Sequence, residues 1–278
     1  MTNTTAISVA RGATKKRPIA GYIGAAMLVA ILIGGGISVL VMSPNFITGD
    51  TLQSPSVAHI FGTDSSGRDV FARTLAAALA DLPLALVSTV VAAVVGTGLG
   101  LLSTFSSRSE SIMRVIDGFQ AFPTLILILV IVRVTGGGIG VLILTLSLLN
   151  IPRFVRIARA EALQLLSSRY VTFAEVIGAS RLYVLLRHVL PNISGQLLAQ
   201  ASISTAVSLS AIGAMSFLGL GIAPPTPSWG NMLQLGTSGL SIGFWWPVLF
   251  PCLGLVWSIV AANLIADSLD AHYAKELR

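Results

Sequence analysis

Long stretches without a charged residue constrain the fold of this chain more than any other feature. Residues 19–42 and 82–105 contain no Asp, Glu, Lys or Arg. Each run is long enough to cross the hydrocarbon core of a bilayer as a helix. Charged residues make up only 10% of the chain, whereas soluble proteins have about 25%. The sequence therefore predicts an all-α integral membrane protein.

Weaker runs raise the number of expected spans to six. Asp117 and Arg133 lie near the ends of the third run, which Pro123 is expected to kink. The fourth run ends in Arg153, Arg156 and Arg159, which are expected to emerge into the cytosol. No residue between 188 and 266 is charged, which fits two spans joined by a neutral loop at 219–245. The expected spans are 19–42, 82–105, 115–134, 141–157, 193–218 and 246–266.

The distribution of Lys and Arg predicts the orientation of these spans. With both ends on one side, 14 of the 17 basic residues lie on that side, and only Arg68, Arg73 and Arg133 lie on the other. Basic residues concentrate on the cytoplasmic side of membrane proteins. We therefore expect a cytoplasmic N-tail (1–18), an uncleaved first span and a cytoplasmic C-tail (267–278). The same bias accounts for the net charge of +6 without nucleic acid as a partner.

The second expected span and the segment that precedes it carry local signals of their own. Gly96, Gly98 and Gly100 in the second span are expected to let another helix approach closely. The extracytoplasmic segment 43–81 contains HIFGTDSSGRDVFAR (59–73), which is rich in turn-forming residues and leads into a short helix at 70–80. Two interpretations stay open for this motif. It is either a folded loop held by Asp64–Arg68 and Asp69–Arg73 contacts, or a contact surface for a partner permease or a binding protein.

The segment 159–191 is predicted to form a cytoplasmic elbow of two short amphipathic helices. Tyr170, Phe173, Ala174 and Ile177 share one helical face, and Gly178 is suited to end that helix. Ser180 is suited to cap a second helix whose apolar face is Leu182, Leu185, Leu186 and Val189. Leu190-Pro191 is expected to end it. The elbow either rests on the lipid surface or docks on a protein outside the membrane.

The loop GLGIAPPTPSWGNML (219–233) cannot be one continuous helix, because it contains Pro224, Pro225 and Pro227. Such backbone is tolerated near a membrane only against protein or a watery cavity. We therefore expect Pro224, Pro225, Pro227, Trp229 and Gly230 to face the side from which solute arrives. Trp229, Trp245 and Trp246 suit the membrane–water boundary.

The sequence offers no support for an enzyme. It contains no GxxxxGK[ST] phosphate-binding loop, one cysteine (Cys252) and three histidines that are far apart. Apart from Asp117 and Arg133 at span ends, the expected spans carry no ionisable residue, which disfavours an ion-coupled carrier. We expect no metal or cofactor in this chain. A channel, a carrier or a membrane scaffold are the alternatives from other classes.

Three strings resemble the dipeptide/oligopeptide/nickel branch of bacterial ABC importer permeases. They are HxxGTDxxGRDxxxR (59–73), YVxxAxxxGAS with RHVLPN (170–192), and MSFLGLGIAPPTPSWGNML (215–233). The cytoplasmic loop departs from the family pattern at Thr172, where the family has glutamate, and at His188, where it has isoleucine. The resemblance implies a type I ABC importer permease fold with six transmembrane helices and cytoplasmic coupling helices.

That resemblance also implies the partners and the coupling residues. A second permease, two cytosolic ATPases that hold ATP and Mg, and an extracytoplasmic binding protein would complete an importer in the bacterial cytoplasmic membrane. Peptides are the expected solutes, with nickel or another metal chelate as the alternative. The outer-segment motif comprises Gly62, Thr63, Asp64, Gly67, Arg68 and Asp69. The ATPase-coupling residues would be Thr172, Phe173, Ala174, Glu175, Gly178, Ala179, Ser180, Arg181, Leu190 and Pro191.

Overall fold

The computed structural model describes residues 19–105, 113, 114, 116, 118, 120, 123–167 and 180–276, and its elements are almost all helices. Two isolated β-bridges, Ile47 with Arg68 and Thr63 with Asp69, hold the segment between the first two helices. In chain order the elements are α1 (Ile19–Ile37), the π-helical turn η1 (Ser38–Met42), α2 (Val70–Ser103), α4 (Thr124–Thr135), α5 (Ile139–Leu166), α7 (Arg181–Val184), the π-helical turn η2 (Leu185–Val189), α8 (Leu190–Phe217), α9 (Trp229–Leu240) and α10 (Trp246–Glu276).

Five helical segments in the described ranges are long and apolar enough to cross a membrane. They are Ile19–Met42, Val70–Ser103, Ile139–Leu166, Arg181–Phe217 and Trp246–Tyr273. The apolar helix α4 has 12 residues, so it rises only about 18 Å, less than a hydrocarbon core of about 30 Å. Pro123 is the N-cap residue of α4. Residues 121 and 122 lie outside the described residues, so the kink expected at Pro123 stays a prediction.

The long helices extend beyond the apolar runs from which they were predicted. α2 begins at Val70, because the Asp69 carboxylate accepts a hydrogen bond from the backbone N–H of Ala72 at 2.8 Å and caps the helix. The short helix expected at 70–80 is therefore the first part of α2. α5 continues to Leu166 and α10 to Glu276, because helix-forming residues follow each apolar run.

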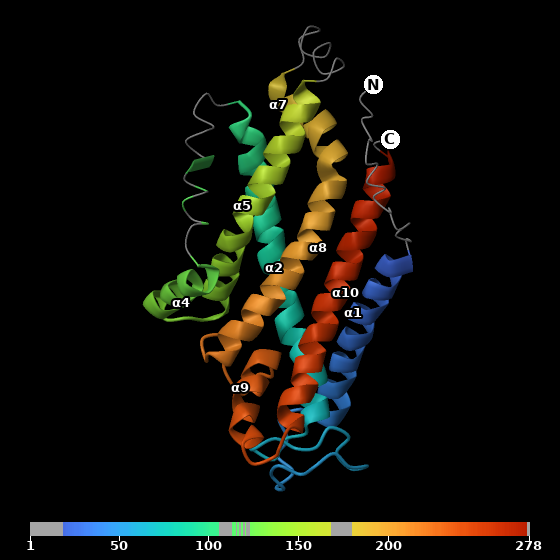
Figure 1. Cartoon of the computed structure of the whole chain (residues 1–278), viewed down its shortest axis with the longest axis vertical. Coiled ribbons are helices and arrows are strands. Elements are labelled where there is room, and N and C mark those ends of the chain that lie inside the picture. Colours follow the sequence, from blue (N-terminus) through green and yellow to red (C-terminus); the bar gives the residue numbers. More distant parts are fainter. Residues whose placement is uncertain are drawn as a thin grey trace, which may run out of the picture.

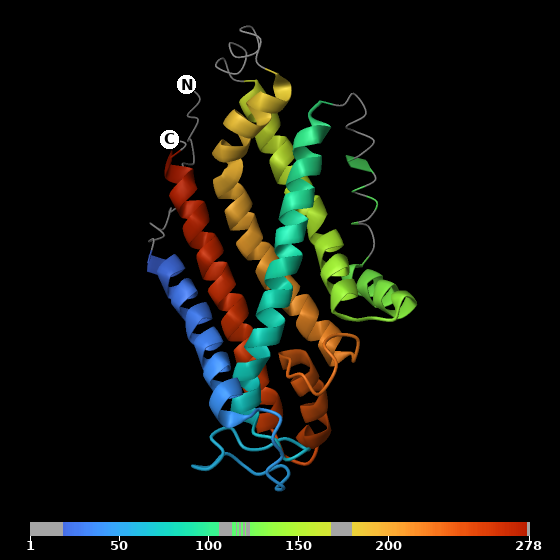
Figure 2. The same ribbon diagram turned by 180° about the vertical axis from the view of Figure 1, so that it is seen from behind.

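Helix α2 runs through the middle of the bundle and contacts α1, α5, α8 and α10 (Figures 1 and 2). α1 and α10 pack against each other along one edge, and α4 lies at the opposite edge beside α5. The segment 43–69 and α9 occupy one end of the bundle, whereas α7 lies at the other end (Figure 1). The elements that could face a partner at either end are thus connected through the same few long helices.

Two glycines bring α2 and α5 into close contact. A Cβ atom at Gly96 would lie 2.7 Å from Cβ of Phe154, and one at Gly100 would lie 2.7 Å from the carbonyl oxygen of Val155. Gly98 faces away, and a Cβ there would meet nothing within 4 Å. The expectation of close helix approach is therefore confirmed for Gly96 and Gly100 and was wrong for Gly98.

Side-chain hydrogen bonds connect the same helices in the bundle core. The Ser147 hydroxyl of α5 donates to the carbonyl oxygen of Ser88 in α2 at 3.0 Å. The Asn150 amide of α5 donates to the Ser208 hydroxyl of α8 at 3.1 Å. Such bonds hold membrane helices together, because apolar side chains gain little from leaving lipid for another apolar surface.

Replacing Gly96 with alanine is expected to destabilise the chain, because the added methyl group would overlap Phe154. Overpacking of this kind costs about 1–3 kcal/mol. Thermal unfolding of the purified protein in mild detergent should show a lower midpoint for Gly96→Ala. The matched control is Gly98→Ala, which should be neutral or slightly stabilising because alanine favours helix over glycine. Equal midpoints for the two variants would contradict the packing.

Candidate functional site

The outer segment, residues 43–69, is organised around the side chain of Asp64. Its Oδ1 accepts hydrogen bonds from the backbone N–H groups of Ser66 and Arg68, at 2.8 and 2.9 Å. Its Oδ2 lies 3.6 Å from Nε of Arg68 and 3.7 Å from Nε of Arg73. Arg73 is 1% exposed and also donates to Oδ1 of Asn45 at 2.7 Å. A carboxylate paired with a buried guanidinium therefore holds the segment on the start of α2.

The expected pair between Asp69 and Arg73 is replaced by other contacts. Arg73 lies against Asp64, and Asp69 instead caps α2 with Oδ1 and accepts a hydrogen bond from Nδ1 of His59 with Oδ2, at 2.8 Å. The expected Asp64–Arg68 pair is present. Sequence spacing found both acidic residues, but it could not show that Arg73 points back toward the Gly62–Arg68 turn.

The remaining residues of this motif shape the same turn. Gly62 and Gly67 have φ angles of +72° and +74°, which residues with a side chain adopt only with strain. The Thr63 hydroxyl donates to the carbonyl oxygen of Asp50 and accepts from the N–H of Gln53, both at 2.8 Å. The structure thus brings together all six residues of the predicted outer-segment motif, and each contributes through the chemistry of its residue type. They are Gly62, Thr63, Asp64, Gly67, Arg68 and Asp69.

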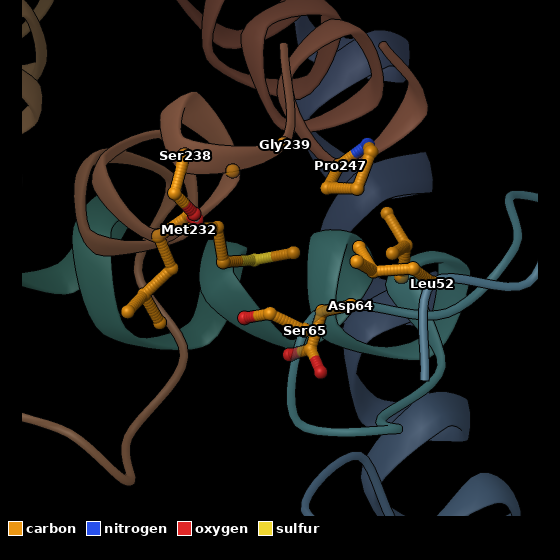
Figure 3. A pocket seen from close by; sticks show the side chains of 10 residues that line it. Leu52, Asp64, Ser65, Met232, Ser238, Gly239 and Pro247 are labelled. Carbon is orange, nitrogen blue, oxygen red and sulfur yellow. The ribbon is translucent and has the colours of Figure 1, made fainter. Parts of the chain in front are cut away.

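The outer segment rests on α9 and the start of α10. The indole Nε1 of Trp246 donates to the carbonyl oxygen of Thr63 at 3.1 Å. A narrow crevice remains between the outer segment and α9, and Figure 3 shows Met232 extending into it beside Asp64 and Ser65. Any force on the outer segment would therefore reach α9 and α10 directly.

The start of α9 is bound to α2 through Asp81. Oδ2 of Asp81 accepts hydrogen bonds from the backbone N–H of Trp229 at 2.9 Å and from the Ser228 hydroxyl at 3.2 Å. The indole Nε1 of Trp229 donates to the carbonyl oxygen of Thr74 at 2.9 Å. A carboxylate at a helix N-terminus also interacts favourably with the helix dipole. α9 is therefore attached to α2 at two points.

Sequence reasoning missed the role of Asp81. The predicted extracytoplasmic segment 43–81 ends at Asp81, but this residue lies within α2 and is 1% exposed. Trp229 and Trp246 are buried within the protein, while Trp245 is exposed. A lone aspartate in the apolar run around residue 81 was the available signal. No signal in the sequence pointed to its partner, the backbone N–H of Trp229, which lies far along the chain.

The proline-rich loop before α9 lines a cavity of about 570 Å³. Ile222 and Thr226 form one wall, Pro83 and Leu84 of α2 a second, and Ile139 of α5 a third. Asn231 of α9 steadies the loop, since its amide donates to the carbonyl oxygens of Thr226 and Ile222. Pro224 and Pro225 are exposed, joined by a cis peptide bond, whereas Pro227, Trp229 and Gly230 are buried.

At the other end of the bundle, the structure describes the second half of the elbow. The Ser180 hydroxyl accepts a hydrogen bond from the N–H of Tyr183 at 3.3 Å, so its predicted capping role is confirmed. Arg181 begins α7 directly after this cap. The other coupling residues proposed from the resemblance, namely Thr172, Phe173, Ala174, Glu175, Gly178 and Ala179, lie outside the described residues.

The elbow does not end at Leu190-Pro191, contrary to the prediction. The π-helical turn η2 precedes the proline, and the N–H of Leu190 bonds to the carbonyl oxygen of Leu185, five residues back. A π turn shifts the hydrogen-bond ladder, so that Pro191, which lacks an N–H, falls in the first turn of α8. Arg181 to Phe217 is therefore one continuous helical segment.

The buried face of the elbow also differs from the predicted one. Leu185 and Val189 are buried as expected, but Leu182 and Leu186 are exposed and Val184 takes their place. The buried face packs on the C-terminal parts of α2 and α5 in a cluster of Leu101, Ala158, Ala162, Val184, Leu185, Val189 and Ile193.

A comparison of the sequence with known proteins identifies the family of this chain. Residues 92–278 match the family described as binding-protein-dependent transport system inner membrane component. The chain belongs to this family. It is a multi-pass permease component of the ABC transport systems that use a binding protein and an ATPase, and it is not itself an enzyme and carries no cofactor.

Individual relatives place the chain in the peptide-type branch. It is 38% identical to a Brucella suis permease named for peptide transport, over 78% of this chain and 73% of that protein. It is 35% identical to the di/tripeptide transport system permease protein DppC of Pseudomonas aeruginosa, over 78% and 72%. It is 35% identical to the glutathione transport system permease protein GsiD of Escherichia coli, over 88% and 83%.

Replacing Asp64 with asparagine should loosen the outer segment. The buried guanidinium of Arg73 would lose its ionic partner, and breaking a buried pair in this way costs about 3 kcal/mol. Hydrogen exchange of residues 43–69 should accelerate relative to the wild type. Asp50→Asn removes one charge from an exposed position of the same segment and is the control. If both variants exchange at the wild-type rate, the pair does not hold the segment.

Replacing Asp81 with alanine should detach the start of α9. The N–H of Trp229 and the Ser228 hydroxyl would be left buried without this acceptor, at a cost of about 1–3 kcal/mol. Asp81→Asn keeps an acceptor oxygen and should lose much less stability. Thermal unfolding in detergent separates the two variants. If Asp81→Asn is as unstable as Asp81→Ala, the hydrogen bonds that Asp81 accepts from Trp229 and Ser228 are not its main contribution to stability.

Proposed function

We propose that this chain is one of two permease subunits that form the translocation path of an ATP-driven peptide importer. A related permease would pair with it, two cytosolic ATPases would bind below, and an extracytoplasmic binding protein would deliver di- or oligopeptides. The names of the relatives support peptides as the solute class, since they specify peptide, di/tripeptide and glutathione transport.

The proposed topology has six spans with both termini in the cytoplasm. Helix α4 would form the third span together with the residues before it, within 115–134. The elbow and the inner ends of α2 and α5 would then face the cytosol, and the outer segment and α9 would face the binding protein. The excess of basic residues on the elbow side supports this orientation.

In this proposal, the elbow transmits the movement of the ATPases to the spans. Residues 172–181 would contact the ATPase, with Phe173, Ala174, Gly178 and Ala179 at the centre and Glu175 and Arg181 matching its charges. The observation that carries this is the continuous segment Arg181–Phe217, packed on α2 and α5, because a displacement of its end cannot be absorbed by a flexible hinge. The elbow must bind the two ATPase states with different affinities, since otherwise it could not shift the equilibrium between conformations.

The outer segment and the proline-rich loop would receive the solute. The outer-segment motif from Gly62 to Asp69 would contact the binding protein, and its attachment to α2, α9 and α10 would pass docking on to the spans. The cavity of about 570 Å³ behind the loop would lie at the outer end of the path. Its size suits a side chain or a short peptide.

A Gly178→Val variant tests the coupling proposal. A bulky residue at this elbow position should leave membrane insertion intact but abolish ATPase association and peptide uptake, since it would alter the docking surface. Co-purification in mild detergent and uptake into proteoliposomes measure the two effects. The control is Gly36→Val on α1, where a Cβ would meet nothing within 4 Å. Normal assembly and uptake by Gly178→Val would refute the docking role.

A further inference from the structure

A second pocket lies between α4 and α5 and has a volume of about 330 Å³. Arg153 and Arg156 of α5, together with Gln120 and Thr124, form its polar part. Leu127 and Leu148 belong to its apolar part. The pocket is therefore amphipathic, because two guanidinium groups of α5 and apolar side chains of α4 and α5 line it together. None of the functions described above uses it.

Arg153 is held in position by a chain of hydrogen bonds across two helices. Its Nη1 donates to Oδ1 of Asn150 at 3.1 Å. The Asn150 amide donates to the Ser208 hydroxyl of α8 at 3.1 Å and to the carbonyl oxygen of Leu146 at 2.9 Å. Asn150 is 2% exposed, so it cannot turn freely. The guanidinium is therefore oriented before any ligand binds, which lowers the entropic cost of binding.

The position of Arg153 in α5 indicates that the pocket is accessible to water. Arg153 lies near the middle of α5, within a segment long enough to cross the membrane, whereas the sequence placed it at the end of the fourth span, where the chain was expected to emerge into the cytosol. Ionisable side chains in such segments face other helices or a water-filled cavity, since exposure to lipid is costly. By contrast, the span Ile19–Met42 at the opposite edge is the most apolar and the least buried of the five. We therefore expect the α1 edge of the bundle to face lipid and the α4–α5 edge to face the translocation path.

We propose that this pocket binds the carboxylate of the transported solute as it passes the inner half of the path. This inference rests on the proposed function, because the solute must be a peptide or a similar carboxylic acid. Guanidinium groups pair with carboxylates through two parallel hydrogen bonds, and Gln120 can donate a further one. The apolar wall at Leu127 and Leu148 would accommodate the side chain next to the carboxylate.

The test compares peptides with and without the carboxylate in the reconstituted transporter. Wild type and Arg153→Gln are assembled with their partner subunits in vesicles, with binding protein saturated by a dipeptide or by its C-terminal amide. Wild type should take up the dipeptide about tenfold faster than the amide, and Arg153→Gln should take up both at the slow rate. ATPase stimulation by the loaded binding protein should stay unchanged, because that signal originates at the outer surface.

Two further variants separate charge from folding. Arg153→Lys keeps the positive charge and should restore part of the preference for the carboxylate. Arg133→Gln removes an exposed charge from α4 outside the pocket and should behave as the wild type. A carboxylate preference of equal size in wild type and Arg153→Gln would overturn the inference. Failure of the wild type to import either peptide would instead refute the proposed function.

The phosphate of an anionic lipid could make the same contacts, so the assay is run in two lipid compositions. One set of vesicles contains phosphatidylcholine alone, and the other also contains phosphatidylglycerol. The difference between wild type and Arg153→Gln should be the same in both sets. A difference that appears only with phosphatidylglycerol would assign the pocket to lipid and overturn the solute site.

Discussion

Close packing against α2 is the constraint on which the arrangement of the other described helices depends. Near the start of α2, Asp64 pairs with Arg73 and Asp81 accepts a hydrogen bond from the start of α9. Near its C-terminal end, Gly96 and Gly100 admit α5 to backbone contact, and Leu101 joins the apolar cluster that also contains Val184 and Leu185.

The same arrangement explains how distant surfaces can act together. The outer segment is attached to α2 and α10, the proline-rich loop is attached to α2 through α9, and the elbow continues into α8 without a break. A movement at either end is therefore carried by helices that pack closely and cannot deform gradually. Such packing favours transitions between discrete arrangements, as alternating access requires.

The agreement between sequence and structure depends on how far each interaction reaches along the chain. Ser180, Gly62 and Gly67 act on neighbouring residues, and their roles in capping and turns followed from local chemistry. Asp69 also acts locally, but the sequence predicted a pair with Arg73 and not the cap that it forms on α2. Arg73, Asp81 and Trp229 have partners that lie far away in sequence, so their burial could not be anticipated. The continuation of the elbow through Pro191 depended on a π turn, for which no residue pattern gives a clear signal. Gly98 shows the same limit, since three glycines at one spacing do not reveal which of them face a neighbour.

The sequence by itself determined that the chain is a helical membrane protein, where most of its apolar helices lie and which family it resembles. The first two properties follow from the cost of placing charged and polar groups in lipid, which depends on composition and length. The resemblance rests on three motifs that can be read without the fold. Only the tertiary structure decided which charges are buried in pairs and which helix caps α9. It also decided that Arg153, near the middle of α5, lines a pocket beside α4. These depend on which helices become neighbours, and that is set by close packing between residues far apart in the chain.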